Sequence, residues 1–160
     1  MKKEWRDKIS AILRVEPLRI NSALVSAQNR DRLYWTNIPG VSVPQDRHIG
    51  LNTIIGDYDC IWVCRRGKNK GGLKPYIFAG VGKSPAVTCS SWQYNFFPVI
   101  EGVKRRFMIN EVEQIQTLPI DYTAVPGVSS TARFVACGNG WTLEVIKHLF
   151  RGLLIEGQKN

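Results

Sequence analysis

Acidic residues are missing from a long central part of this 160-residue sequence. Between Cys60 and Ile100 there is no Asp or Glu, whereas six Lys and Arg side chains occur there, two thirds of the net charge of +9. Aromatic residues are interleaved with these cations. A region of one charge sign attracts polyanions, most often nucleic acid. A solvated basic loop beside core aromatics would have the same composition, so charge alone leaves both readings open.

Long apolar runs are also absent. No stretch approaches the roughly 20 apolar residues that cross a bilayer. The opening residues, Met-Lys-Lys-Glu-Trp-Arg, lead into a charged amphipathic stretch, whereas a signal peptide would continue into an apolar core. Hydrophobic residues make up 44% of the chain, which is enough for a folded core. We therefore expect a cytoplasmic protein with no membrane partner.

Metal-binding residues are scarce. The chain has two His and four Cys, which we expect to be reduced thiols because no secretory signal is apparent. Cys60 and Cys64 have a spacing that occurs in zinc sites, but the alternation Cys-Ile-Trp-Val-Cys favours a strand with both thiols on one face. No metal site is therefore expected.

Hydrophobic periodicity predicts a mixture of helices and short strands. Helices are expected over 3–13, 110–117, 131–137 and 142–154, with a helical turn over 51–55. Strands are expected over 18–21, 33–38, 60–64, 76–79 and 86–89. Asn110 followed by Glu113 has the spacing of a capping box, and Gly138-Asn139-Gly140 is expected to break a helix.

Three separated segments resemble, in order, the C-terminal blocks of the cytosine-5 DNA methyltransferases. The first is Gln28-Asn29-Arg30-Asp31-Arg32-Leu33-Tyr34-Trp35, similar to a Gln-x-Arg-x-Arg block. The second is Arg106-Phe107-Met108-Ile109-Asn110-Glu111-Val112-Glu113, continuing to Gln116-Thr117-Leu118-Pro119. The third is Gly138-Asn139-Gly140-Trp141 with Val145, similar to a terminal Gly-Asn block. Three blocks in order, around a variable basic region, are more specific than any one of them.

The resemblance implies a partial α/β fold: the C-terminal part of a methyltransferase fold that uses S-adenosyl-L-methionine (SAM), with an inserted, mostly β target-recognition lobe. It divides the chain into the end of a catalytic lobe (1–40), a target-recognition region (41–105) and C-terminal helical blocks (106–160). Members of this family flip a cytosine out of the duplex, attack C6 with a Cys thiolate, bind the base through a Glu and transfer a methyl group to C5.

By the same resemblance, Arg30 and Arg32 belong to the pocket of the target cytosine, and Arg32 reaches the base or its phosphate. A guanidinium is suited to this role because it is permanently charged and donates in a planar fork. The alternative is a surface ion pair with Asp31 or another acid. Gly138, Asn139 and Trp141 would border the SAM pocket. The alternative is a helix N-terminal turn with a core tryptophan, and both can be true together.

The target-recognition region would bind double-stranded DNA with two kinds of side chain. Polar residues of a loop over 87–97 would approach the bases, and basic residues would hold phosphates, which gives affinity without sequence information. The DNA-binding residues expected are Gln28, Arg65, Arg66, Lys68, Lys70, Lys83, Ser90, Ser91, Gln93, Tyr94 and Asn95.

Two motifs that the family needs for catalysis do not occur in these 160 residues: the Pro-Cys of the nucleophile and the Glu-Asn-Val of the base-binding Glu. Phe78-Ala79-Gly80-Val81-Gly82 matches the SAM-cradling pattern but lies between the wrong blocks and precedes a β-like run. We therefore expect this chain to be inactive alone and to share SAM with the missing blocks. These blocks would lie on a complementary chain of a two-gene enzyme, or in the rest of a longer protein of which this sequence is a fragment.

Other functions remain open at this point. The chain could be a non-catalytic DNA-binding or regulatory module, or a decayed remnant of such an enzyme. It could also be an unrelated basic α+β domain whose blocks match by chance.

Overall fold

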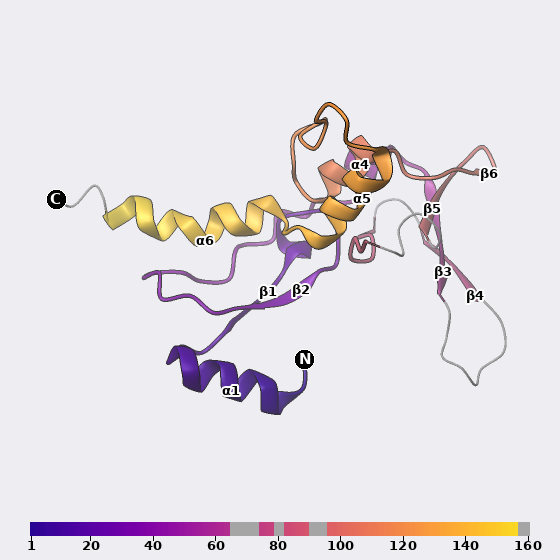
Figure 1. The fold of residues 1–160 in the computed structure, drawn as a ribbon. Helices are drawn as coiled ribbons and strands as arrows, with labels where there is room; N and C mark the ends of the chain where they lie inside the picture. The colour runs from indigo at the N-terminus through magenta and orange to yellow at the C-terminus, as the bar shows by residue number, and fades with distance from the viewer. Residues whose placement is uncertain (65–73, 79–81, 90–95, 157–160) are drawn as a thin grey trace.

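The computed structural model describes residues 1–64, 74–78, 82–89 and 96–156. In chain order the elements are α1 (Lys3–Leu13), β1 (Leu18–Asn21), η1 (Ser22–Leu24), β2 (Asp31–Tyr34), α2 (Asn52–Ile55), β3 (Asp59–Cys64), β4 (Lys74–Phe78), β5 (Phe96–Ile100), β6 (Val103–Lys104), α4 (Ile109–Ile115), α5 (Ser130–Asn139) and α6 (Leu143–Glu156). The chain is a mixture of helix and sheet, as its sequence predicts (Figure 1).

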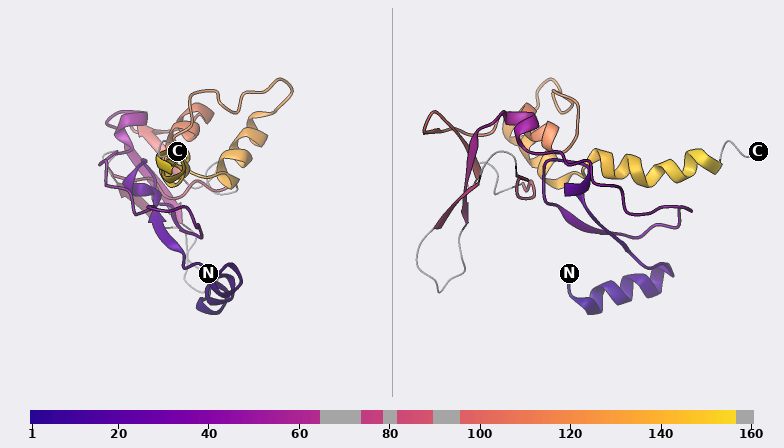
Figure 2. Two further views of the ribbon diagram at one scale, coloured as in Figure 1. Left: turned by 90° about the vertical axis from the view of Figure 1, so that its left-hand side faces the viewer. Right: turned by 180° about the vertical axis from the view of Figure 1, so that it is seen from behind.

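The strands form two separate antiparallel sheets. β1 pairs with β2, so that Leu18 lies opposite Tyr34. The second sheet has the order β4-β3-β5-β6, and all its strands fall within the predicted target-recognition region. Figure 1 and the right-hand view of Figure 2 place this sheet and α6 at opposite ends of the molecule.

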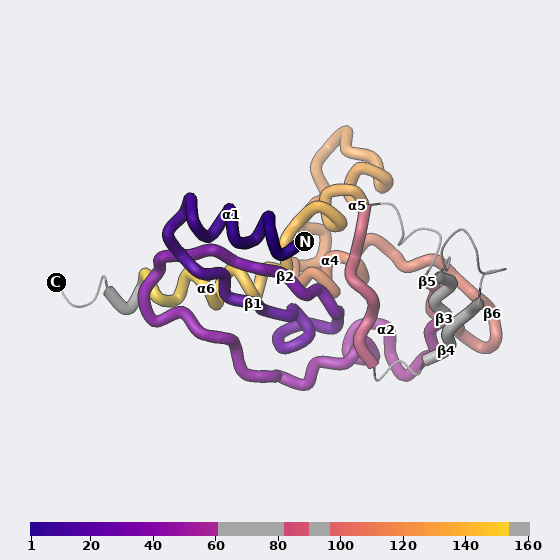
Figure 3. Tube along the Cα trace, turned by 90° about the horizontal axis from the view of Figure 1, so that it is seen from below, coloured from indigo at the N-terminus to yellow at the C-terminus, as the bar shows by residue number. Residues whose placement is uncertain are grey.

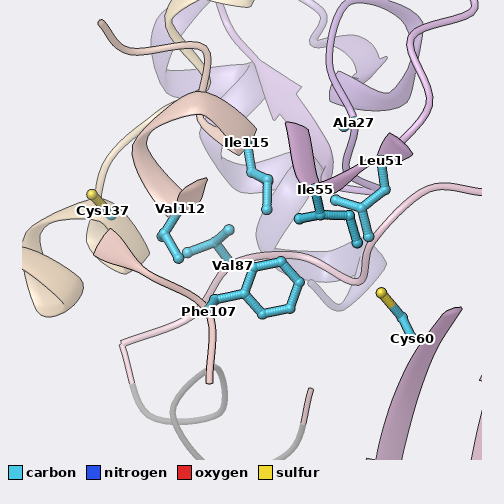
Figure 4. Packing of buried hydrophobic residues seen from close by; sticks show 9 residues of the cluster. All are labelled: Ala27, Leu51, Ile55, Cys60, Val87, Phe107, Val112, Ile115 and Cys137. Carbon is cyan, nitrogen blue, oxygen red and sulfur yellow. The ribbon is translucent and has the colours of Figure 1, made fainter. Parts of the chain in front are cut away.

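Two clusters of buried side chains hold the elements together. The larger one lies between α2, α4 and α5 and includes the start of β3; its members are Ala27, Leu51, Ile55, Cys60, Val87, Phe107, Val112, Ile115 and Cys137 (Figure 4). The smaller one joins β1 to α6 and consists of Ile20, Val25, Val145 and Leu149. Each fully buried aliphatic side chain stabilises the fold by about 1.5–3 kcal/mol, so these clusters position the segments described below.

Several predicted elements are confirmed. The helix over 3–13 and the strand over 18–21 have the predicted bounds, and the helical turn near 51–55 and the strands near 60–64 and 76–79 are present.

In the ranges that the structure describes, no helix is both long enough and apolar enough to span a membrane.

Other predicted elements are wrong. Residues 86–89 form no strand, because side chains engage the backbone there: Val87 N donates to Gln28 Oε1, and Val87 O accepts from Arg30. The second strand begins and ends earlier than predicted, at Asp31–Tyr34.

The predicted helix ends near the second and third blocks also need correction. α4 begins after Met108, whose N–H donates to Glu111 Oε2, so Asn110 is not the cap and Glu113 does not close a capping box. α5 does not break at Gly138 but continues to Asn139.

Candidate nucleic-acid interface

Gln28, the first residue of the Gln-x-Arg-x-Arg block, is fully buried where the three blocks meet. Its Nε2 donates to Ile115 O (3.1 Å) and Gln116 Oε1 (2.8 Å), which belong to the second block. The same Nε2 lies 3.3 Å from the Oγ1 of Thr142, directly after the third block, and Oε1 accepts from Val87 N at 3.1 Å. The expectation that Gln28 contacts DNA is therefore wrong for this structure, since its amide is enclosed and bonded internally.

Arg30 joins the first block to the third. Its side chain is buried, with 6% of the residue exposed, and its guanidinium donates to the backbone oxygens of Val87, Gly138 and Gly140. Burial, and then repulsion from Arg32, lower the pKa of Arg30. Because the guanidinium faces carbonyls of the chain itself, Arg30 does not line an open cytosine pocket as expected.

Arg32 lies two residues further along β2 and is exposed. Its Nη1 donates to the backbone oxygen of Asp31 at 2.8 Å, and no carboxylate among the described residues pairs with it. The surface ion pair with Asp31 is therefore not formed; Asp31 pairs with Arg19. Arg32 keeps a guanidinium that a ligand can approach.

A hollow of about 620 Å³ adjoins Arg32, between α1 and the β1–β2 sheet. We call it the α1–β2 hollow; it is lined by Met1, Lys3, Arg6, Arg19, Asp31, Arg32 and Leu33. The hydrogen bond from Arg19 lowers the pKa of Asp31, so this carboxylate stays ionised and engaged at neutral pH. The hollow is therefore a basic surface with one carboxylate, which is already paired.

The Gly-Asn block has a different environment from the expected cofactor wall. Gly138 is buried against another backbone segment: a Cβ there would lie 2.2 Å from Cys89 N and 2.4 Å from the carbonyl carbon of Thr88. Asn139 is exposed, and Trp141 is 67% exposed, so Trp141 is not a core tryptophan either. Asn139 and Trp141 could still contact a SAM molecule, whereas the free side of Gly138 is filled by protein.

Lys83, which was expected to hold a phosphate, instead donates its hydrogen bonds to the backbone of the chain itself. Its Nζ donates to the backbone oxygens of Ala23, Ser26 and Ile49, which uses all three of its N–H donors. Burial lowers the pKa of Lys83.

The remaining predicted DNA contacts lie outside the described residues: Arg65, Arg66, Lys68, Lys70, Ser90, Ser91, Gln93, Tyr94 and Asn95. Residues 79–81 of the SAM-like pattern do as well.

The described thiols offer no activated nucleophile in the interior. Burial raises the pKa of Cys60 to about 12 and that of Cys137 to about 11, so both are neutral at physiological pH. Cys89 is exposed. Among the residues whose positions are described, no three His, Cys, Asp or Glu side chains gather as a metal site would require.

Sequence reasoning missed two groups of residues. Lys3, Arg6 and Arg19 line the hollow; the spacing of Lys3 and Arg6 on a helix is the signal that could have placed them on one face. Glu113, assigned to a cap, is instead a fully buried acceptor for Arg133. No local signal marks this role, because on a helix Glu113 lies about 100° from Val112 and about 160° from Ile115, away from the face that those two residues share.

A scan against models of known protein families finds none that matches this chain. A relationship to the cytosine-5 DNA methyltransferases is therefore a proposal that depends on the three blocks and on the contacts between them.

Proposed function

We propose that this chain is the DNA-recognition half of a cytosine-5 DNA methyltransferase, which positions a flipped cytosine while a complementary chain supplies the nucleophilic Cys and the base-binding Glu. The observation that carries the proposal is the convergence of the three blocks on Gln28 and Arg30. Gln28 and Thr142 are 114 residues apart in sequence, yet their side chains lie within hydrogen-bond distance.

Convergence supports the proposal because segments that form one site have to lie together in the fold. Here the block residues themselves make the contacts: Gln28 binds Gln116, and Arg30 binds the carbonyls of Gly138 and Gly140. Buried hydrogen bonds of this kind are costly to leave unmade, so the blocks stabilise one another where they meet. These contacts support the interpretation that the three blocks are parts of one site.

The two arginines of the first block would then have separate roles. Arg30 holds the blocks together, and Arg32 contacts the target cytosine or its phosphate, because only Arg32 has an exposed guanidinium. Exposed Trp141 and Asn139 would face the complementary chain and the SAM held there. SAM would supply the methyl group that is transferred.

Methyl transfer tests the proposal directly. The purified chain, incubated with radiolabelled SAM and duplex DNA, should transfer no methyl groups, because Pro-Cys and Glu-Asn-Val do not occur in it. Co-expression with a neighbouring gene product that carries both motifs should yield 5-methylcytosine, detected by mass spectrometry of digested DNA. Methyl transfer by the chain alone, or none by the pair, would overturn the proposal.

Arg32→Ala in the two-chain enzyme should lower the methylation rate by about 100-fold, or ~2.7 kcal/mol, and leave the thermal midpoint unchanged. Arg151→Ala, which removes another exposed arginine, is the matched control and should have little effect on either measurement. Arg30→Ala should instead destabilise the fold by about 3 kcal/mol, because it leaves three carbonyls without their donor. Equal behaviour of the Arg30 and Arg32 variants would contradict the separate roles.

A non-catalytic DNA-binding module is the second candidate. The burial of Cys60 and Cys137 favours it, because neither of these thiols can act as a nucleophile. Duplex binding by the chain, combined with no methylation from any chain that carries the missing motifs, would select this candidate over the first.

A further inference from the structure

The α1–β2 hollow brings together basic residues from two parts of the chain. Lys3 and Arg6 lie three residues apart on α1, and Arg19 and Arg32 lie on β1 and β2. Figures 1 and 3 show α1 running alongside the β1–β2 sheet. Ser10 fixes the helix there, since its Oγ accepts a hydrogen bond from Trp35 Nε1 at 3.1 Å.

Positive charge in the hollow is only partly compensated. Asp31, the one carboxylate among the described residues that line the hollow, accepts from Arg19 through both oxygens. Arg6 pairs with Asp7 at 2.9 Å. Lys3 and Arg32 have no carboxylate partner among the described residues. The hollow therefore presents two uncompensated cations beside two others whose ion pairs are exposed and weak.

Exposure indicates which kind of anion fits. The Arg19 side chain is 74% exposed and that of Arg6 42%, and Lys3 is exposed as well. A site for a small free anion would enclose its donors, because water competes strongly for exposed ones. An open basic surface instead suits a polymer whose repeated charges release counterions when it binds.

We propose that the α1–β2 hollow binds the phosphodiester backbone of duplex DNA, with Lys3, Arg6 and Arg19 as phosphate-binding residues beside Arg32. The inference rests on the proposed function, which makes duplex DNA the ligand. It adds contact residues on α1, β1 and β2, which lie outside the acid-free part of the sequence between residues 60 and 100. Phosphate contacts at this position would orient the duplex relative to Arg32 without reading sequence.

The test compares two double variants that remove the same charge. Lys3→Ala/Arg6→Ala removes the two basic side chains that α1 contributes to the hollow. Lys147→Ala/Arg151→Ala removes two exposed cations of α6. Binding of a fluorescein-labelled 20-base-pair duplex is measured by anisotropy over a range of salt concentrations. The first variant should bind the duplex about 10-fold more weakly. Its slope of log affinity against log salt should be shallower by nearly 2, because each lost phosphate contact removes about 0.9. The control should change both values far less.

Folding and ligand source are checked in parallel. Far-UV circular dichroism and the thermal midpoint should match the wild type, and Lys3→Glu, which disturbs no packing, should weaken binding further than Lys3→Ala. Inorganic phosphate should compete no better than chloride at equal ionic strength. Stronger competition by phosphate would overturn the proposal in favour of a small-anion site.

The outcomes separate this inference from the proposed function. If the wild-type chain does not bind the duplex at low salt, the proposed function fails. If the wild type binds but the two double variants have the same affinity and slope, only the phosphate site in the α1–β2 hollow is overturned.

Discussion

Gln28, Arg30 and Arg32 alternate along one short segment but lie in different surroundings. Gln28 and Arg30 are buried and bond to the other two blocks, whereas Arg32 is exposed beside the α1–β2 hollow. A shared motif therefore contains both structural and ligand-facing residues. Replacing the first two should affect folding, and replacing the third should affect binding.

Gly138→Ala should be strongly destabilising. The new Cβ would lie 2.2 Å from Cys89 N and 2.4 Å from the carbonyl carbon of Thr88, and backbone atoms cannot move aside as a side chain could. We expect a loss of about 3 kcal/mol or more in the free energy of unfolding, measured by urea denaturation. Gly140→Ala is the control, since its Cβ meets Ala136 O at 3.1 Å and requires only a small shift. Equal losses for the two variants would contradict this packing.

At the scale of elements, Glu113 connects α4, α5 and the loop between them. Its carboxylate accepts from the backbone N–H groups of Asp121 (2.7 Å) and Thr123 (2.9 Å), from the Thr123 hydroxyl and from Arg133 Nη2 (3.0 Å). Arg133 also pairs with Asp121 at 3.0 Å. One buried carboxylate thus holds the loop near 121–123 against both helices.

Acid should weaken this connection. Burial pushes the pKa of Glu113 upwards, but the hydrogen bonds from Thr123, Arg133 and Asp121 outweigh it, so the folded-state pKa lies below the ordinary 4.5. The stabilisation is therefore complete above about pH 4.5 and is lost as the pH falls through the folded-state value. Glu113→Gln should cost about 3 kcal/mol at pH 7 and progressively less below pH 4.5.

Urea denaturation between pH 7 and 3 measures the difference between wild type and Glu113→Gln. Glu16→Gln, at an exposed carboxylate, should track the wild type throughout. A gap for Glu113→Gln that stays constant down to pH 3 would show that its carboxylate is not held in the ionised form.

For the whole molecule, the spread of positive charge should govern DNA affinity. About six phosphate contacts would give a slope near −5 for log affinity against log salt, measured by anisotropy between about 50 and 200 mM salt. Arg65→Ala/Arg66→Ala/Lys68→Ala should weaken binding and flatten this slope by nearly 3, because each lost contact removes about 0.9.

Lys8→Ala/Lys147→Ala/Arg151→Ala is the matched triple variant and should retain most of the affinity and slope. Unchanged binding after the Arg65, Arg66 and Lys68 substitutions would favour an unrelated basic α+β domain whose blocks match by chance. Failure of the wild type to bind any duplex at low ionic strength would remove nucleic acid as the partner.

Local pattern in the sequence determined much of the secondary structure. The helix over 3–13 and the strand over 18–21 could be predicted to the residue, because an amphipathic stripe and a short β-prone run after Pro17 are local signals. The acid-free stretch and the absence of the two catalytic motifs are likewise properties of the sequence alone.

Tertiary structure decided which polar side chains are accessible. No neighbouring residue in the sequence shows that the partners of Gln28, Lys83 and Glu113 come from other segments. Those partners enclose Gln28 and Glu113, and they accept from all three N–H donors of Lys83. A lysine contributes the same positive charge to the sequence pattern whether its side chain faces solvent or donates to three carbonyl oxygens. Only long-range packing distinguishes Lys83, which is partly buried and bonded to backbone carbonyls, from Lys3, which is exposed. Hydrogen bonds to the backbone depend on where the chain returns in space.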